Sequence, residues 1–333
     1  MRRVRCGSAL VARWVVLFLC LAFGGTALAT TWDEPWHEEV MVSADSFVKV
    51  RITEVQGSSC KAEVLKVLGG MQLSGQIELA GFSRLRVMST SSDSDELRVP
   101  FRLDEIYYLF IKKDAKTSKY QLPTPTSGWA DVQKGIVTAT YRHSYHKALV
   151  PEDTYEKTMQ AIFSGVKDQP YDTEFMASFL KQQLSMSVAS LTDDQETNKK
   201  FFLQHVALES FYYLRKGVDL SWLIPFVNFE NYHAQISACR AVSAIDSPAS
   251  RDQLMKFIEG KGAGFAKVMC VWGLKRLKAK EMITRLQAYL KSRDDEKTGF
   301  GGSIMDPRIG TFFPGSVQES VSSLLREWGQ PAP

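Results

Sequence analysis

Two stretches, AQISACRAV at Ala234–Val242 and AKVMCVWGL at Ala266–Leu274, determine our prediction of the fold. They align without a gap at an offset of 32 residues, and the match continues beyond them, since Leu254 aligns with Leu286. A match over two successive helical patterns at one offset indicates repeated helix pairs, and a repeat of this length is typical of an α-solenoid.

A third, shorter copy follows at Ser316–Trp328, with apolar residues at helical spacing. Ala241 and Gly273 are small residues within the first two copies, and we expect them to let neighbouring helices pack closely. We therefore predict a helical domain of HEAT-like repeats over residues 149–333.

The helical spacing of apolar residues begins at Pro151. Asp172–Thr173 and Thr192–Gln195 are typical N-cap sequences, and each precedes an apolar helical pattern. These signals predict three further helices between the start of the domain and the repeats.

The chain before Pro151 has the alternation of β-strands. We expect short strands at residues 46–55, 60–68, 76–79, 105–111, 119–122 and 135–141. The run Glu105–Ile111 is the most apolar and is expected at the centre. Strands at hairpin spacing predict a small barrel or sandwich, so we place a β-domain at residues 30–148.

The 333 residues carry a formal charge of +4, and the excess lies entirely in residues 1–29, which hold four arginines and no acid. Without them the chain has 37 basic and 37 acidic residues, which argues against a globally cationic nucleic-acid-binding protein. The apolar run Trp14–Phe23 and the sequence Ala27–Ala29 are typical of a cleaved signal peptide. We expect an exported protein, periplasmic or secreted, with no stable membrane span after cleavage.

Three cysteines remain after residue 29, namely Cys60, Cys239 and Cys270. The repeat alignment places Cys239 and Cys270 one position apart on equivalent helices. Neighbouring helices lie about 8–10 Å apart, whereas a disulfide needs Cα atoms within about 7 Å. We therefore predict free thiols.

Residues 36–142 resemble the OB barrel of the netrin/tissue-inhibitor-of-metalloproteinase type. The resemblance is carried by Trp36, Glu38–Glu39, Ala44–Asp45, Val64–Gly70, Tyr107–Phe110, Tyr120 and Pro123–Gly128. Residues 219–328 resemble HEAT or armadillo repeats. The inhibitors act through an N-terminal cysteine, and a chain that starts near Thr30 has none. The resemblance therefore implies the fold and not that inhibitory mechanism.

Familiar catalytic motifs are absent from the sequence, including G-x-S-x-G, H-E-x-x-H and the Walker loop. His143 and His146 are the one close histidine pair. They are either exposed histidines at a domain junction or metal ligands together with Glu152 or Asp153. We expect no enzymatic activity, no cofactor and no metal.

Three features are candidates for binding a partner. Trp32 and Trp36 are either an exposed aromatic pair or, for Trp36, a plug of the barrel end. The loop Arg293–Pro314, with Phe300, is either a structural cap or a binding lid. Residues 256–293 hold ten basic and two acidic side chains. Among the basic ones, we expect Lys267, Lys275 and Lys278 on the face of the helices that binds a partner.

The sequence thus predicts a non-catalytic binding or scaffold protein of the cell envelope. It would engage a protein or an anionic envelope component through the repeat surface and the barrel. The alternative is an inhibitor or regulator of a secreted enzyme that acts through the N-terminal edge of the barrel.

Overall fold

The computed structural model describes residues 32–57, 59–81, 100–124, 126–144, 146–292, 294–298, 309–310 and 313–331. The residues from Trp32 onward belong to one compact unit. The predicted signal peptide, Phe300 and most of the Arg293–Pro314 loop lie outside the described residues.

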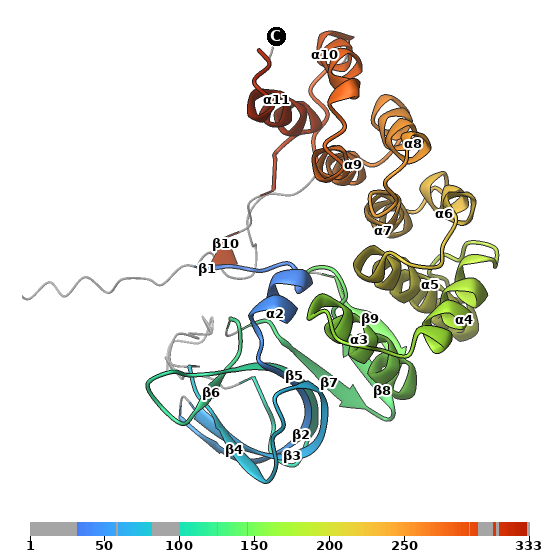
Figure 1. The fold of residues 1–333 in the computed structure, drawn as a ribbon. Coiled ribbons are helices and arrows are strands. Elements are labelled where there is room, and N and C mark those ends of the chain that lie inside the picture. The colour runs from blue at the N-terminus through green and yellow to red at the C-terminus, as the bar shows by residue number, and fades with distance from the viewer. Residues whose placement is uncertain are drawn as a thin grey trace, which may run out of the picture. The chain divides into compact units, whose positions relative to one another are not determined.

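The first half of this unit contains a closed five-stranded barrel (Figure 1). Its strands, in spatial order, are β2 (Ser46–Gln56), β3 (Ser59–Gly70), β4 (Gln76–Leu79), β6 (Tyr120–Gln121) and β5 (Ile106–Lys113). An antiparallel pairing of β2 with β5 closes the ring. The predicted small barrel is therefore confirmed, and β5 is central as expected because it pairs with β2, β6 and β7.

Three further strands extend the sheet from β5, and one short helix precedes the barrel. The strands are β7 (Trp129–Gln133), β8 (Ile136–Ala139) and β9 (Ala148–Pro151), and the helix is α2 (His37–Ser43). A parallel pair joins β1 (Trp32–Asp33) to β10 (Ile309–Gly310). The helix α2 was not predicted from the sequence, because seven residues are too few to reveal a helical period.

Strand β5 is buried on both faces, which explains its uninterrupted apolar sequence. Tyr107, Leu109 and Ile111 point into the barrel core, whereas Tyr108 and Phe110 belong to the core shared with the helices. The outside of the barrel thus provides the surface on which α3 (Glu152–Val166) packs.

The helical half continues with α4 (Thr173–Leu184), α5 (Gln195–Leu214), α6 (Leu220–Val227), α7 (Tyr232–Val242), α8 (Pro248–Glu259), α9 (Gly264–Arg276), η2 (Lys280–Met282), α10 (Ile283–Ser292) and α11 (Val317–Glu327). The predicted caps are confirmed, since Asp172 accepts a hydrogen bond from Phe175 N and Asp194 accepts one from Thr197 N. None of the helices in the described ranges combines the length and apolar character needed to cross a bilayer.

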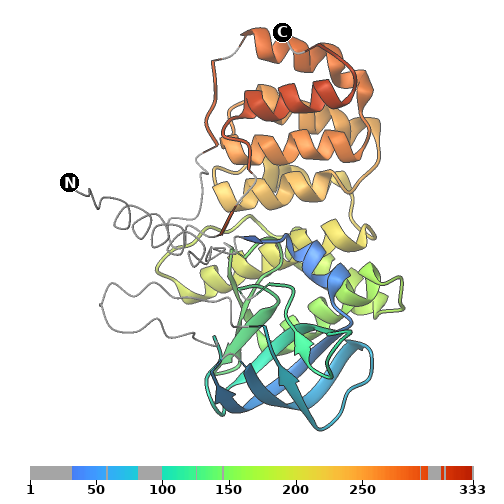
Figure 2. The ribbon, with the colours of Figure 1, turned by 90° about the vertical axis from the view of Figure 1, so that its left-hand side faces the viewer.

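These helices lie in two rows (Figures 1 and 2). Helices α5, α7, α9 and α11 pack on one another in sequence order, and α4, α6, α8 and α10 pack behind them. The two aligned stretches occupy equivalent places in α7 and α9, so that Ile236 and Val268 are both fully buried. Gly273 is needed for this contact, because a Cβ atom there would lie 2.8 Å from the Cβ of Ser243.

One hydrophobic core extends from the outer face of the barrel to α11, and a second fills the barrel. Strand β9 ends at Pro151 and α3 begins at Glu152. The division into domains at residues 148/149 stays a prediction. Cys60, Cys239 and Cys270 are buried free thiols, as predicted.

Candidate functional site

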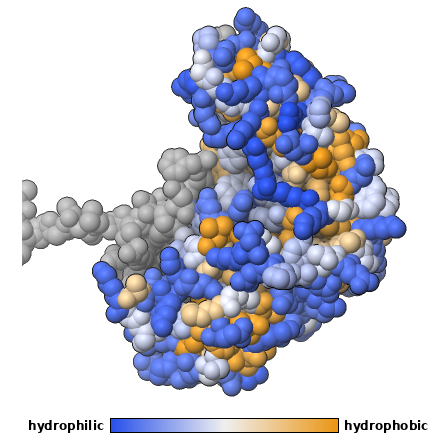
Figure 3. Space-filling view, in the orientation of Figure 1, coloured by the Kyte–Doolittle hydropathy of each residue, from blue (hydrophilic) through white to orange (hydrophobic). Residues whose placement is uncertain are grey.

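A small pocket opens where the barrel half meets the helices. It is lined by Trp36, Arg142, His143, His146, Tyr232, His233, Phe265 and Phe313, and its volume is about 50 Å³. We call it the junction pocket. Figure 3 shows the surface in the orientation of Figure 1, on which hydrophobic and hydrophilic residues are interspersed over the helices and the barrel.

Several short segments place these side chains together. Trp36 forms a β-bridge with His143, and the backbone N–H of His37 donates to the carbonyl of Arg142 at 2.8 Å. Tyr232 and His233 form the first turn of α7. Phe265 lies in the first turn of α9. The pocket therefore combines the start of α2, the loop between β8 and β9, and two helix N-termini.

A cluster of buried charged side chains lies next to the pocket and includes one of its lining residues. Glu209 on α5 is fully buried and accepts a hydrogen bond from Arg240 Nε at 2.9 Å, and Arg142 Nη1 lies 3.9 Å from the same carboxylate. Arg142 also donates to Ser237 Oγ at 2.9 Å. Two guanidinium groups thus share one carboxylate, and Arg142 extends from this cluster to line the pocket.

All five histidines of the chain are buried or half-buried, and burial lowers the pKa of each. The rings of His146 and His205 lie 4.1 Å apart, and those of His146 and His233 lie 4.8 Å apart. Burial, with Arg142 nearby, lowers the pKa of His146 to about 2. These imidazoles are therefore neutral near pH 7.

Polar atoms of the pocket are left without partners. The Nδ1 atoms of His146 and His233 have no hydrogen-bond partner among the residues that the structure describes. Within the same residues, no group of three His, Cys, Asp or Glu side chains is arranged to hold a metal ion. Glu152 instead accepts a hydrogen bond from Tyr108 on the barrel. The alternative ligand set of His143 and His146 with Glu152 or Asp153 is therefore not assembled in the described part of the chain.

Aromatic rings form the rest of the pocket and its surroundings. Trp36 meets Trp272 and Phe313 edge-on, with ring centroids 5.8 Å apart in both pairs. The Arg240 guanidinium lies 4.8 Å from the Trp36 ring and 3.9 Å from that of Tyr212. Cation–π contacts of this kind hold Trp36 at the junction.

The structure corrects two expectations for sequence-predicted residues at this junction. Trp36 does not plug the barrel, because its ring packs between the barrel half and α9. His143 and His146 are not exposed, since 5% and 8% of their surfaces remain accessible. Trp32 is described only as backbone paired with Ile309, and Phe300 lies outside the described residues.

The expected exposure of Lys267 is also wrong. Its side chain is 3% exposed, and its Nζ atom lies 2.7 Å from Glu296, which follows α10 in the chain. Lys275 is exposed and pairs with Glu327 on α11 at 2.6 Å, and Lys278 is exposed. The three lysines therefore do not form one solvent-facing row.

Four of the ten basic side chains in the stretch 256–293 form ion pairs with acids in the described part of the chain. Besides Lys267 and Lys275, Lys256 pairs with Asp252, and Arg285 pairs with Asp252 and Glu259. Ion pairs, most of which join different helices, thus compensate part of the local charge imbalance in the sequence.

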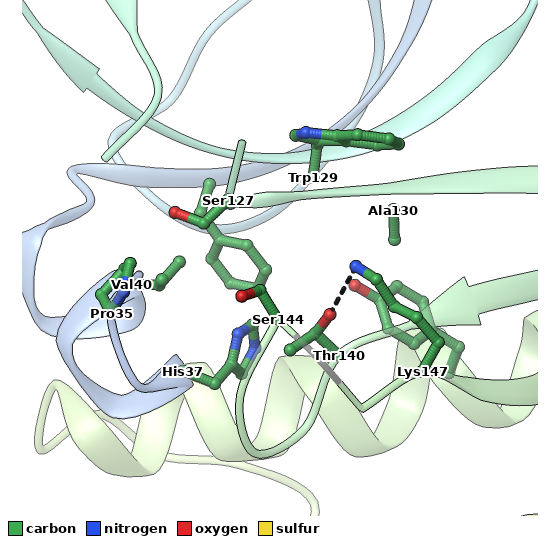
Figure 4. A pocket seen from close by; sticks show the side chains of 12 residues that line it. Pro35, His37, Val40, Ser127, Trp129, Ala130, Thr140, Ser144 and Lys147 are labelled. Atoms are coloured by element: carbon green, nitrogen blue, oxygen red, sulfur yellow. Dashed lines mark hydrogen bonds between the residues drawn. The ribbon is translucent and has the colours of Figure 1, made fainter. Parts of the chain in front are cut away.

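Two other cavities are less suited to a functional role. One, shown in Figure 4, lies at the barrel edge, where Lys147 donates to Thr140 at 2.8 Å near the Trp129 ring; it holds only about 10 Å³. The other is an open groove of about 320 Å³ beside α4 and α5, lined by Tyr171, Met176 and Leu180 among others. In the first cavity, Trp129 Nε1 and Ser144 Oγ are buried without a hydrogen-bond partner among the described residues, but the space is little more than that of one water molecule. The described residues of the groove include no such buried atom.

Sequence reasoning missed Arg142, Glu209, Arg240 and the histidines of α5 and α7. No short motif links these positions, which are distant in the chain. Comparison with known proteins adds no further residue, because no family model, curated protein or solved structure matches this sequence.

Proposed function

We propose that the protein is a non-catalytic binding protein that captures a partner protein at the junction pocket. The observation that carries this proposal is the combination of aromatic sides, a buried arginine and unpartnered imidazole nitrogens in a pocket of about 50 Å³. Sites for small molecules and cofactors usually measure about 300–1,000 Å³. A pocket this small suits one side chain or one chain end of a larger partner.

The architecture supports the same proposal. The closed five-stranded barrel supports the OB-like resemblance, and the equivalent helix pairs α7–α8 and α9–α10 support an α-solenoid of HEAT-like repeats. Solenoids present extended surfaces on which a partner lies. A partner that enters the pocket would lie along the row α5, α7, α9 and α11.

We also propose export to the cell envelope, on the basis of the arginines and apolar run in residues 1–29. Cell fractionation tests this part separately. Recovery of an unprocessed protein in the cytoplasm would contradict it and would leave the binding site unaffected.

The binding proposal is tested by capture of partners with matched variants of the whole protein. Tyr232→Ala combined with His233→Ala changes two half-buried side chains of the pocket. Tyr171→Ala is the control, because it removes an aromatic ring from the α4–α5 groove. We expect one partner to be lost with the double variant and retained with the control. Loss of the partner with the Tyr171→Ala control alone would show that the partner binds in the α4–α5 groove and not in the junction pocket.

The alternative inhibitor function depends on the N-terminal segment. Deletion of residues 30–33 removes β1 and leaves Trp36 in place. Under the binding proposal, the deleted protein retains its partner. Complete loss of binding would favour the inhibitor function. A deletion that includes Trp36 would not separate the two, since Trp36 lines the junction pocket.

A further inference from the structure

We infer that the junction pocket binds the terminal carboxylate of a polypeptide whose last residue is apolar. This inference rests on the proposed function, and it names the chemical group of the partner that enters the pocket.

The first argument is charge. Arg142 and Arg240 share the single carboxylate of Glu209, so the buried cluster holds one positive charge in excess. Burial lowers the pKa of Arg142 to about 10, which leaves its guanidinium protonated at neutral pH. The nearby acids Glu34 and Glu38 also act on other bases, since they oppose the effect of burial on the pKa of Lys147 and of Arg276, respectively. A buried charge without a counter-ion is costly, and an anion in the pocket would relieve that cost.

The second argument is the set of hydrogen-bond donors. The neutral imidazoles of His146 and His233 each have a buried Nδ1 atom without a partner in the described part of the chain. His146 is 8% exposed, and both side chains line the pocket. A neutral imidazole donates from one nitrogen, so each ring can supply one N–H to a bound oxygen.

The third argument is the backbone. Residues Tyr232 and His233 start α7, and the Asn231 cap accepts the N–H of Ala234 and not theirs. The first N–H groups of a helix and its dipole favour an anion. Together with Arg142 and the imidazoles, they surround the position of one carboxylate.

The aromatic residues select the kind of carboxylate. Trp36, Tyr232, Phe265 and Phe313 line the same pocket and give it an apolar side. An aspartate or glutamate side chain would fill the polar side only. A terminal apolar residue presents its carboxylate and its side chain from the same Cα atom, so it matches both sides.

The test is calorimetric titration of the whole protein with N-acetylphenylalanine and with its amide. We expect the free acid to bind and the amide to bind at least about tenfold more weakly, since a charge-assisted hydrogen bond contributes about 1.5–3 kcal/mol. An N-acetylglutamate α-amide, which carries only a side-chain carboxylate, should be as weak as the amide. Inorganic phosphate should not compete.

Variants locate the binding. Arg142→Gln should lower the affinity for the free acid at least about tenfold. Because Arg142 also supports the fold, His233→Ala provides a second variant at a half-buried position, with a severalfold loss expected. Tyr171→Ala should bind like the wild type.

Equal binding of acid and amide, equal binding of the glutamate probe, competition by phosphate, or wild-type affinity in His233→Ala would each overturn the inference. These outcomes would leave the proposed function intact if the Tyr232/His233 double variant fails to capture the partner protein. If the free acid binds to the protein but the Tyr232/His233 double variant still captures the partner protein, the proposed function is contradicted instead.

Discussion

The ammonium group of Lys267 lies 2.7 Å from the carboxylate of Glu296, and the lysine side chain is 3% exposed. Removal of one partner from a buried ion pair costs about 3–5 kcal/mol. We therefore expect Lys267→Glu to lower the free energy of unfolding by at least about 3 kcal/mol, measured by urea denaturation. Lys278→Glu, at an exposed position, should change it by no more than about 0.5 kcal/mol. Equal effects of the two reversals would contradict the internal role of Lys267.

His37 gives a residue-scale prediction for pH dependence. Burial, aided by Lys147 and Arg240, lowers its pKa from 6.5 to about 3. Between these values the unfolded chain binds a proton that the folded protein does not bind. The stability that the neutral His37 side chain contributes is therefore fully present above pH 6.5. It is lost as the pH falls from 6.5 toward 3.

The measurement is urea denaturation of the wild type and His37→Phe between pH 6 and pH 4. Phe110 lies edge-on to the His37 ring, so an aromatic replacement suits the site. The variant should show a pH dependence that is shallower by up to about 1.4 kcal/mol per pH unit. Identical pH profiles would show that His37 is not held neutral.

At the site, residues that have a local signal in the sequence were predicted. Residues that come together only in the folded protein were not. Trp36, His143 and His146 were singled out because of their residue type and spacing. Arg142, by contrast, lies in a loop without periodicity, and its partner Glu209 lies within a helix. The pairing of these two charges depends on the packing of the barrel half against α5, which no pattern in the sequence encodes.

At the scale of elements, Gly273 determines how closely α9 approaches α7 and α8. A Cβ atom there would lie 2.8 Å from Ser243 Cβ and 3.1 Å from Leu254 Cδ1. We expect Gly273→Val to destabilise the protein by about 1–3 kcal/mol, the usual cost of overpacking, as measured by thermal or urea denaturation. The exposed Lys275→Ala on the same helix is the control and should cost no more than about 1 kcal/mol. An unchanged stability in Gly273→Val would mean that the helices are further apart.

The long elements were predictable from the sequence; of the short ones, β4, β6 and β8 were predicted, whereas α2, α6, β7 and β9 were not. The strands β2 and β3 are long enough to show a period of two, and the helices α7 and α9 were predicted because their sequences align at one offset. The helix α6 has only eight residues and contains Pro225, a residue that is unfavourable inside a helix. β9 has only four residues, which is too few for a reliable alternation.

At the scale of the whole molecule, the barrel and the helices share one core. Phe47, Tyr108 and Phe110 on the outside of the barrel belong to the same cluster as Leu325 on α11. Each such aromatic side chain gains about 1.5–3 kcal/mol from burial. A fragment of residues 30–148 would expose these rings.

We therefore expect the fragment 30–148 to lack a cooperative thermal transition, whereas the whole protein unfolds in one transition. Circular dichroism and calorimetry check both outcomes. A sharp transition in the isolated fragment would show that the barrel is an independent domain, as the division at residues 148/149 supposes.

The central claim is that a partner protein enters the junction pocket. It is tested most directly by a photo-crosslinking amino acid placed at Tyr232 in the whole protein, in living cells, with the same substitution at Tyr171 as the control. We predict one discrete crosslinked species from position 232 and none from position 171. A species from position 171 alone, or none from position 232, would contradict the claim.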